Sequence, residues 1–220
     1  MSTLEYILNK YKLRNKNHIE IPDVGRDDLA KILHELDFKV GAEVGVRTGL
    51  YSELLCKENP QMKLYAVDLW MSYKTHDTSE IHMYIEDLVP QKRSDQYYEE
   101  AKTRLSSYSN VEIIKETSMD AIKQFEDESL DFVYIDADHK YEYVIEDITE
   151  WSKKIKKGGI VSGHDYYKAT DKTSYMHVKF AVDDYVIKNN IRPLIIWGSN
   201  YMPSDIVLKR DKRRSWSWVK

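Results

Sequence analysis

The stretch from Lys39 to Tyr51 (KVGAEVGVRTGLY) limits what this chain can fold into more than any other part of it. Its apolar first half predicts a buried strand, Gly45 and Gly49 break that strand, and helical character resumes after them. A strand, a glycine turn and a helix start direct unpaired backbone N–H groups at one spot, which suits a nucleotide-like ligand. Glu43 beside the turn would repel a pyrophosphate, so a ligand with a cationic amino-acid group fits better than a dinucleotide.

Length and charge exclude several classes of protein. The 220 residues suit one α/β domain with a sizeable core. The net charge of −4 argues against a nucleic-acid partner, and the single cysteine, Cys56, excludes an internal disulfide framework. The first residues (MSTLEYILNKYKLRNK) contain no uninterrupted apolar segment, and no later run could span a bilayer. We therefore expect a cytoplasmic protein that binds a small molecule and no membrane.

The N-terminal region carries two amphipathic segments ahead of the first strand. Apolar residues recur at helical spacing over Ser2 to Leu13 and over Arg26 to Leu36, with Pro22 as a breaker between them. We expect residues 1–38 to form a helical cap and residues 39–220 to form a single globular domain. The cap could cover a ligand or contact a substrate, and simple packing helices fit the pattern equally well.

The second expected strand, Lys63 to Leu69 (KLYAVDL), carries a carboxylate near its end. At that position of a parallel strand, Asp68 could accept hydrogen bonds from both hydroxyls of a ribose, although a helix N-cap is another interpretation. Trp70 could pack on an adenine face or in the core. The polar segment 71–93 exceeds a minimal strand–helix–strand unit, so we expect a substrate loop or lid there.

The strongest strand of the chain lies at 130–139 (LDFVYIDADH) and must be buried on both faces. It ends in Asp136, Asp138 and His139, and three ionisable groups on one strand tip are costly unless they serve a purpose. Strand-tip aspartates often cap the following helix, which would explain one of these residues but not all three.

The next unit repeats this arrangement. A helix is expected from Tyr141 to Ile155, with Gly158-Gly159 as its stop, and a strand IVSG then ends at His164 and Asp165. Adjacent parallel strands would bring both clusters of ionisable residues to the sheet edge that carries Gly45 and Asp68.

Together these motifs make a specific resemblance. The chain resembles class I S-adenosylmethionine (SAM) dependent methyltransferases in the spacing Glu43-x-Gly45-x-x-x-Gly49. The run IDADHxY, a helix and KKGGIVSGHDY resemble, in particular, the metal-dependent small-molecule and sugar O-methyltransferases of macrolide and cephalosporin tailoring. The resemblance spans roughly residues 39 to 167. It implies a Rossmann-like, doubly wound α/β fold with a mostly parallel seven-stranded sheet, an antiparallel last strand and helices on both faces.

The resemblance also implies roles for individual residues. An aspartate matching Asp136 and the residues matching His164 and Asp165 would hold a divalent metal such as Mg²⁺ or Mn²⁺, and Asp136 and His139 would be catalytic, with His139 as general base. Histidine at position 164 departs from the usual oxygen ligand and favours Mn²⁺ or a transition metal over Mg²⁺. The residues implied to bind the cofactor are Glu43, Gly45, Thr48, Gly49, Asp68, Leu69, Asp136 and, after the short strand 111–115, Ser118 and Met119.

The activity that the resemblance implies is methyl transfer from SAM to a hydroxyl of a small molecule, a sugar or a glycosylated metabolite, with metal assistance. One alternative is metal-independent transfer to nitrogen, with His139 and His164 as the proton acceptors. Another is a SAM-binding or nucleotide-binding protein without catalysis, but such a protein would need Glu43 and Asp68 and not Asp165.

The C-terminal region predicts a helix from His177 to Asn189 and two strands, RPLIIW and DIVLKR, as an antiparallel last pair. The final run, KRDKRRSWSWVK, is basic and contains two tryptophans. A solvated terminus is its simplest interpretation. It could also bind a phosphate of the substrate or anchor a homodimer contact.

Overall fold

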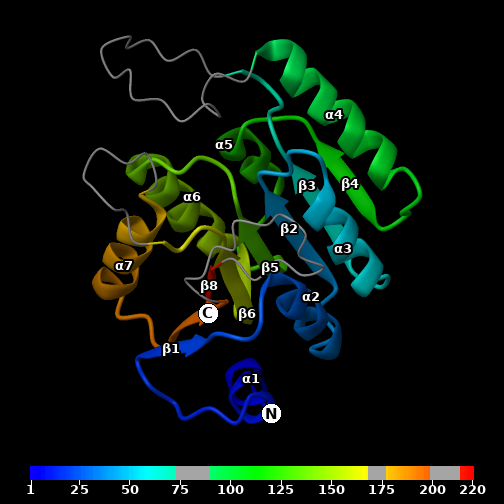
Figure 1. Cartoon of the computed structure of the whole chain (residues 1–220). Coiled ribbons are helices and arrows are strands. Elements are labelled where there is room, and N and C mark those ends of the chain that lie inside the picture. The colour runs from blue at the N-terminus through cyan, green and yellow to red at the C-terminus, as the bar shows by residue number, and fades with distance from the viewer. Residues whose placement is uncertain (73–89, 168–176, 199–213) are drawn as a thin grey trace.

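The computed structural model describes residues 1–72, 90–167, 177–198 and 214–220, and its centre is one eight-stranded sheet (Figure 1). The strand order is β1-β7-β8-β6-β5-β2-β3-β4. All neighbours are parallel except β8, which runs antiparallel to both β6 and β7. The Rossmann-like α/β class is therefore confirmed, with eight strands where seven were expected. The strands are β1 (His18–Ile21), β2 (Val40–Val44), β3 (Lys63–Val67), β4 (Val111–Ile114), β5 (Leu130–Ile135), β6 (Ile155–Gly163), β7 (Leu194–Trp197) and β8 (Ser215–Val219).

Helices cover both faces of this sheet (Figure 1). One core lies between the sheet and α5, α6 and α7, and the other lies between the sheet and α1, α2 and α3. Strand β5 serves both cores: Val133 and Ile135 face the first, while Phe132 and Tyr134 face the second, because successive side chains of a strand point to opposite faces. The helices are α1 (Thr3–Lys10), α2 (Arg26–Glu35), α3 (Leu50–Glu58), α4 (Gln91–Leu105), α5 (Ser118–Ala121), α6 (Tyr141–Lys154) and α7 (Val178–Lys188).

The register of the parallel strands puts their carboxyl ends in one row. Val44 pairs with Val67 on one side and with Ile135 on the other, and Ile135 in turn pairs with Gly163. The residues that follow these four positions therefore open at one edge of the sheet. Strands β3 and β4 lie on one side of β2, and β5 and β6 lie on the other, so the order of the strands reverses at β2. Open α/β sheets bind ligands at such a switch point.

Two glycines shape the turn after β2. Gly45 has a φ of 93°, and a Cβ atom there would overlap the backbone carbonyl of Asp136, so the tip of β5 presses directly on the turn. Gly49, with a φ of 76°, is the N-cap of α3. Both glycines are thus required by backbone conformation, as the break in the sequence pattern predicted.

The N-terminal region is not purely helical. The two expected helices are present as α1 and α2, but residues 18–21 between them form β1, which pairs in parallel with β7 at the edge of the sheet. Ile19 and Ile21 are buried while His18 and Glu20 are exposed. This alternation over four residues is too short to stand out against the polar residues on either side.

The C-terminal expectations need correction. Residues 215–219 form a strand that was not predicted, and the predicted strand DIVLKR lies outside the described residues. Trp216 and Trp218 are buried inside the sheet, so the expected solvated terminus is wrong. The edge of a Trp216 ring lies so close to Gly163 that a Cβ atom would overlap it, and the Trp216 indole N–H donates to the carbonyl of His164 at 3.1 Å.

Two smaller expectations also changed. Helix α6 ends at Lys154, and Gly158 and Gly159 lie within β6 beside a register shift against β5, so they do not form the helix stop. The segment expected as a lid lies mostly outside the described residues, which resume just before α4. None of the helices in the described ranges has the length and apolarity that crossing a membrane requires.

Candidate functional site

A cavity of about 810 Å³ opens at the carboxyl ends of β2, β3, β5 and β6. This volume is typical of small-molecule sites. The predicted site residues gather here: all of them line the cavity except Gly49, which lies at the start of α3. Residues of α2, α4 and α6 complete the wall.

Asp68 holds the glycine turn in place. One carboxylate oxygen accepts the backbone N–H groups of Val46 and Arg47 at 2.9 and 2.8 Å, and the other accepts that of Trp70 at 2.8 Å. Burial raises the pKa of Asp68, against the effect of these hydrogen bonds. The carboxylate that was expected to bind a ribose therefore already serves the loop, and only its remaining lone pairs can serve a ligand. Trp70 is buried, and its indole N–H donates to the carbonyl of Arg47 at 2.7 Å.

Glu43 lies at the bottom of the cavity with 2% of its surface exposed. Its carboxylate accepts a hydrogen bond from the hydroxyl of Ser52. Burial raises the pKa of Glu43 to about 8, although the Ser52 hydrogen bond and the charge of Arg26 oppose the shift. A cationic group that entered the cavity would favour the ionised form of this acid.

Ser118 and Met119 begin the short helix α5, which Thr117 caps by accepting the backbone N–H of Asp120. The hydroxyl of Ser118 donates to the carboxylate of Asp147 and accepts the indole N–H of Trp151 at 2.8 Å. Burial raises the pKa of Asp147 to about 7, against the Ser118 hydrogen bond.

Sequence reasoning missed Asp147, although α6 contains a signal. Val144, Asp147, Ile148 and Trp151 follow the spacing of one buried helix face, and all four are buried. An acid within an apolar stripe is a candidate for a specific task, because burying a carboxylate without partners is costly.

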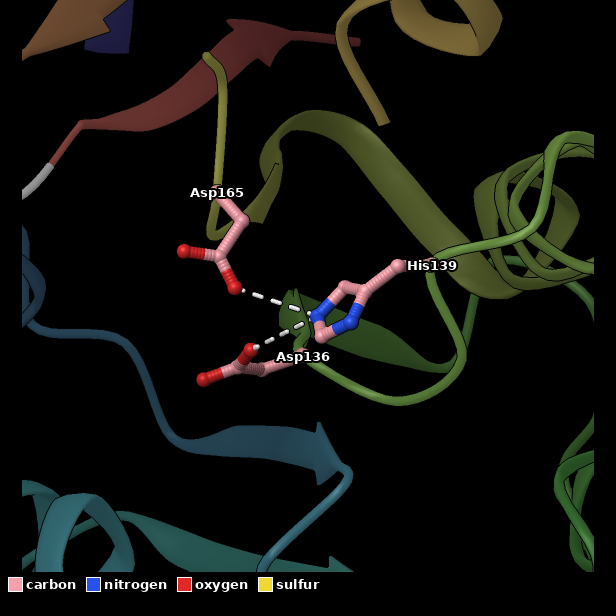
Figure 2. Close-up of side chains that lie close together, drawn as sticks. All are labelled: Asp136, His139 and Asp165. Atoms are coloured by element: carbon pink, nitrogen blue, oxygen red, sulfur yellow. Dashed lines mark ion pairs between the residues drawn. The ribbon is translucent and has the colours of Figure 1, made fainter. Parts of the chain in front are cut away.

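The other end of the cavity gathers Asp136, His139 and Asp165 (Figure 2). His139 Nε2 lies 3.1 Å from Asp165 and 3.9 Å from Asp136, and one ligand atom from each of the three residues falls within 4.8 Å of the others. Asp165 has a φ of 58°, an uncommon conformation for a residue with a side chain. Two carboxylates and an imidazole form a donor set that suits Mn²⁺ and other transition ions, so these residues fit a divalent cation.

Charges are strongly coupled at this end. Burial lowers the pKa of His139, but the neighbouring carboxylates of Asp136 and Asp165 outweigh burial and raise the pKa to about 10. Burial likewise raises the pKa of Asp165, but His139 and His164 outweigh it and hold that pKa well below its usual range. The raised pKa of His139 and the depressed pKa of Asp165 thus have one cause, the close approach of imidazole and carboxylate.

His164 does not join the set of three. It is buried, and its Nδ1 lies 2.9 Å from Asp165 and 3.8 Å from Asp136. Both imidazoles thus lie within reach of both carboxylates, and the one whose ligand atom falls within 4.8 Å of theirs in the set of three is that of His139. The roles of His164 as a metal ligand and of His139 as a general base stay predictions. The geometry also allows the reverse, with His139 as the metal ligand and His164 as the base.

Arg26, at the start of α2, also reaches this end. Its Nη1 lies 3.4 Å from Asp136 Oδ2, and its guanidinium group lies 4.9 Å from the centre of the Tyr51 ring. The Tyr51 hydroxyl donates to the backbone carbonyl of Arg26 at 3.1 Å. The N-terminal region thus contributes a cation to the cavity wall, and nothing in the sequence distinguished Arg26 from the other charged residues of that helix.

A known protein family resembles this chain in sequence, and solved structures resemble it in fold. Residues 42–166, more than half of the chain, match a family model described as "Methyltransferase domain". No curated protein matches the sequence. Solved structures with a similar fold include one from Staphylococcus aureus that is provisionally described as a caffeoyl-CoA O-methyltransferase, with 13% identity, a TM-score of 0.59, and coverage of 99% of this chain and 90% of that one.

Two further structures show how widely the fold is used. The O-methyltransferase TomG from Streptomyces achromogenes, involved in tomaymycin synthesis and solved with SAM, has 14% identity, a TM-score of 0.57 and coverage of 99% and 89%. Precorrin-6y C5,15-methyltransferase from Geobacter metallireducens has 11% identity, a TM-score of 0.56 and coverage of 88% and 87%. At these identities the likeness shows the fold alone, and a fold does not determine the methyl acceptor.

Proposed function

Because this chain belongs to the methyltransferase domain family, we propose that it transfers a methyl group from SAM to a hydroxyl oxygen of a small molecule, assisted by a divalent cation. The observation that carries this proposal is the cluster of Asp136, His139 and Asp165 in the cavity that also contains the glycine turn. Binding SAM alone does not call for a cation site, whereas activating a hydroxyl does.

In this proposal the cofactor lies along the tips of β2, β3 and β4. Glu43 is near the methionine ammonium, the backbone from Gly45 to Gly49 and Thr48 holds the carboxylate end, and Asp68 shares its remaining lone pairs with the ribose. Leu69, Ser118 and Met119 are beside the adenine. The positions of these residues around one cavity support the arrangement.

Chemistry would occur at the tips of β5 and β6. The sulfonium makes the methyl group electrophilic, so the protein must mainly align the nucleophile and accept its proton. A divalent cation, when bound, lowers the pKa of a hydroxyl at this position. Asp136 and Asp165 hold that cation in place of their contacts with His139, and the imidazole released from the carboxylates can accept the hydroxyl proton.

A sugar hydroxyl is the acceptor that we propose. Leu50, Met71 and Tyr143 line the cavity, and each exposes about half of its surface or more: 58%, 54% and 48%. Such an apolar and aromatic rim suits the C–H face of a ring, while the cation would bind its hydroxyl. A glycosylated metabolite would satisfy the same chemistry.

The test is calorimetric titration of the protein with S-adenosylhomocysteine (SAH) and, separately, with Mn²⁺ and Mg²⁺. We expect micromolar SAH binding that Glu43→Ala/Asp68→Ala abolishes, a separate Mn²⁺ isotherm that Asp136→Asn abolishes, and methyl transfer to a panel of sugars that stops with EDTA. Asp138→Asn is the matched control, because Asp138 follows the same strand but lies outside the cluster of three. A folded protein that binds no SAH would overturn the proposal, and EDTA-resistant transfer to an amine would favour the nitrogen alternative.

A further inference from the structure

One corner of the cavity contains a buried acid that the proposed mechanism does not use. Asp147 lines the cavity from α6 and exposes 5% of its surface. Ser118 donates to its Oδ1 atom, and Trp151 donates to Ser118, so a chain of two hydrogen bonds fixes the carboxylate from behind. A carboxylate kept in such a place without a task would be costly to bury.

These hydrogen bonds determine what the corner can offer to a ligand. The single hydroxyl proton of Ser118 is committed to Asp147, so Ser118 cannot donate it elsewhere while that bond persists. The side chain of Met119, the next cavity residue, contains no nitrogen or oxygen. Asp147 has a second oxygen, Oδ2, and among the described residues no donor lies against it. The side chains of this corner therefore present one strong acceptor, Asp147 Oδ2, and no free donor from Ser118 or Met119.

The hydrogen-bond donors of SAM can be assigned one by one. The cofactor has the methionine ammonium, the ribose hydroxyls and the exocyclic amine of adenine. The proposed function assigns Glu43 to the first and Asp68 to the second, and it places the adenine beside Ser118 and Met119. The amine is the one donor group still without an acceptor, and Asp147 is the buried acid that is bonded to Ser118 in that corner.

We propose that Asp147 determines base specificity by accepting a hydrogen bond from the exocyclic amine of the cofactor's adenine. The inference rests on the proposed function, because it requires an adenosyl ligand. Trp151 and Ser118 act as positioning residues that orient the carboxylate.

The test compares SAH with S-inosylhomocysteine, in which a carbonyl oxygen replaces the amine and N1 of the base carries a hydrogen. The wild-type protein should bind SAH about 100-fold more tightly or better, because a carboxylate and a carbonyl oxygen both accept and leave each other unpaired. In Asp147→Asn, the amide can donate to that oxygen, so the ratio of the two affinities should fall below about tenfold. Titration calorimetry measures both affinities.

Two further variants separate this role from a structural one. Glu150→Gln removes a charge from the same helix, where Glu150 pairs with Lys153 at the surface, and should leave the ratio within about twofold of wild type. Ser118→Ala removes the positioning hydroxyl but keeps Asp147, so it should weaken both ligands and preserve discrimination between them. Ligand-free melting temperatures report whether each variant is folded.

The outcomes are distinct. An unchanged ratio in folded Asp147→Asn overturns the inference, and so does a ratio that collapses in Ser118→Ala but not in Asp147→Asn. If Asp147→Asn does not fold, the affinity ratios of the wild type and of Ser118→Ala still test the inference. Equal wild-type binding of the two ligands contradicts it. Tight SAH binding without base discrimination removes this inference alone, whereas absence of SAH binding removes the proposed function as well.

Discussion

The two ends of the cavity hold their acids in opposite ways. At the cofactor end, Glu43 and Asp147 accept hydrogen bonds from neutral hydroxyls, and burial raises their pKa values to about 8 and about 7. At the cation end, Asp136 and Asp165 lie beside charged or chargeable groups, namely Arg26 and the two histidines, and the pKa of Asp165 is depressed.

This difference implies two modes of ligand binding. At the cofactor end, burial raises the pKa values of Glu43 and Asp147. A cationic or hydrogen-bonding ligand would favour the ionised forms of these two acids. At the cation end, Arg26 and His139 lie beside the carboxylates, so a metal would compete with them for Asp136 and Asp165. We therefore expect ligand binding to change the protonation of Glu43 and Asp147 at the cofactor end. At the cation end, we expect a metal to compete with protein cations for the carboxylates.

The largest expected effect comes from breaking the cation end alone. Asp165→Asn should weaken Mn²⁺ binding by about 100-fold or more, because it removes one of two anionic ligands and leaves His139 and His164 without their shared partner. SAH affinity should stay within about threefold of wild type. Calorimetry with each ligand measures both, and a parallel loss of SAH affinity would show that the two ends are not separable.

Glu43→Gln tests the cofactor end in the same way. A hydrogen bond to a charged group is worth about 1.5 to 3 kcal/mol, so SAH should bind about 10- to 100-fold more weakly while Mn²⁺ binding is unchanged. The melting temperature of the ligand-free variant should not fall, because glutamine can still accept from Ser52 and carries no buried charge. A strongly destabilised Glu43→Gln would identify Glu43 as a structural residue.

The pH dependence of stability sharpens the comparison. An acid whose folded-state pKa is raised stabilises the fold fully below its ordinary pKa, here 4.5 for Glu43 and 3.8 for Asp147. That contribution is lost as the pH rises through about 8 and about 7, respectively. The free energy of unfolding of the wild type should therefore fall between pH 5 and 8.5, by on the order of 2 kcal/mol more than in Glu43→Gln/Asp147→Asn. Urea denaturation at the two pH values gives this difference, and equal slopes in both proteins would contradict the assignment.

The smallest effect concerns Arg26. Because its guanidinium lies beside Asp136, Arg26→Gln should strengthen Mn²⁺ binding by roughly three- to tenfold, through loss of a competitor and of a repelling charge. Lys31→Gln on the same helix is the control, since Lys31 is half-exposed and its Nζ lies 4.0 Å from Asp28. Weaker Mn²⁺ binding in Arg26→Gln would show that the arginine organises Asp136 and does not compete for it.

The fold and most of the site could be predicted from the sequence because they depend on local signals. A buried β-branched run that ends in acids, as at 130–139, and a strand broken by Gly45 and Gly49 are readable without tertiary information. The parallel register then requires that their tips meet.

What was missed depends on packing. Arg26 enters the cavity only because α2 docks against α3, and Asp147 matters because of how α6 turns its apolar face toward α5. The strands β1 and β8 are short, and their polar or basic neighbours conceal the buried residues. The residues that bury these two strands lie far from them in the sequence, so no local stretch of sequence reveals that they are buried.

The position of β8 has a consequence for protein synthesis. This strand is translated after all the others, yet it separates β6 from β7, and β1 contacts the sheet through β7. A ribosome that has not yet produced residues 215–219 therefore carries a chain whose first strand has no route to the rest of the sheet. The glycine turn and Asp68 can assemble on the nascent chain, but the carbonyl of His164 gains its Trp216 partner only after residue 216 has been synthesised.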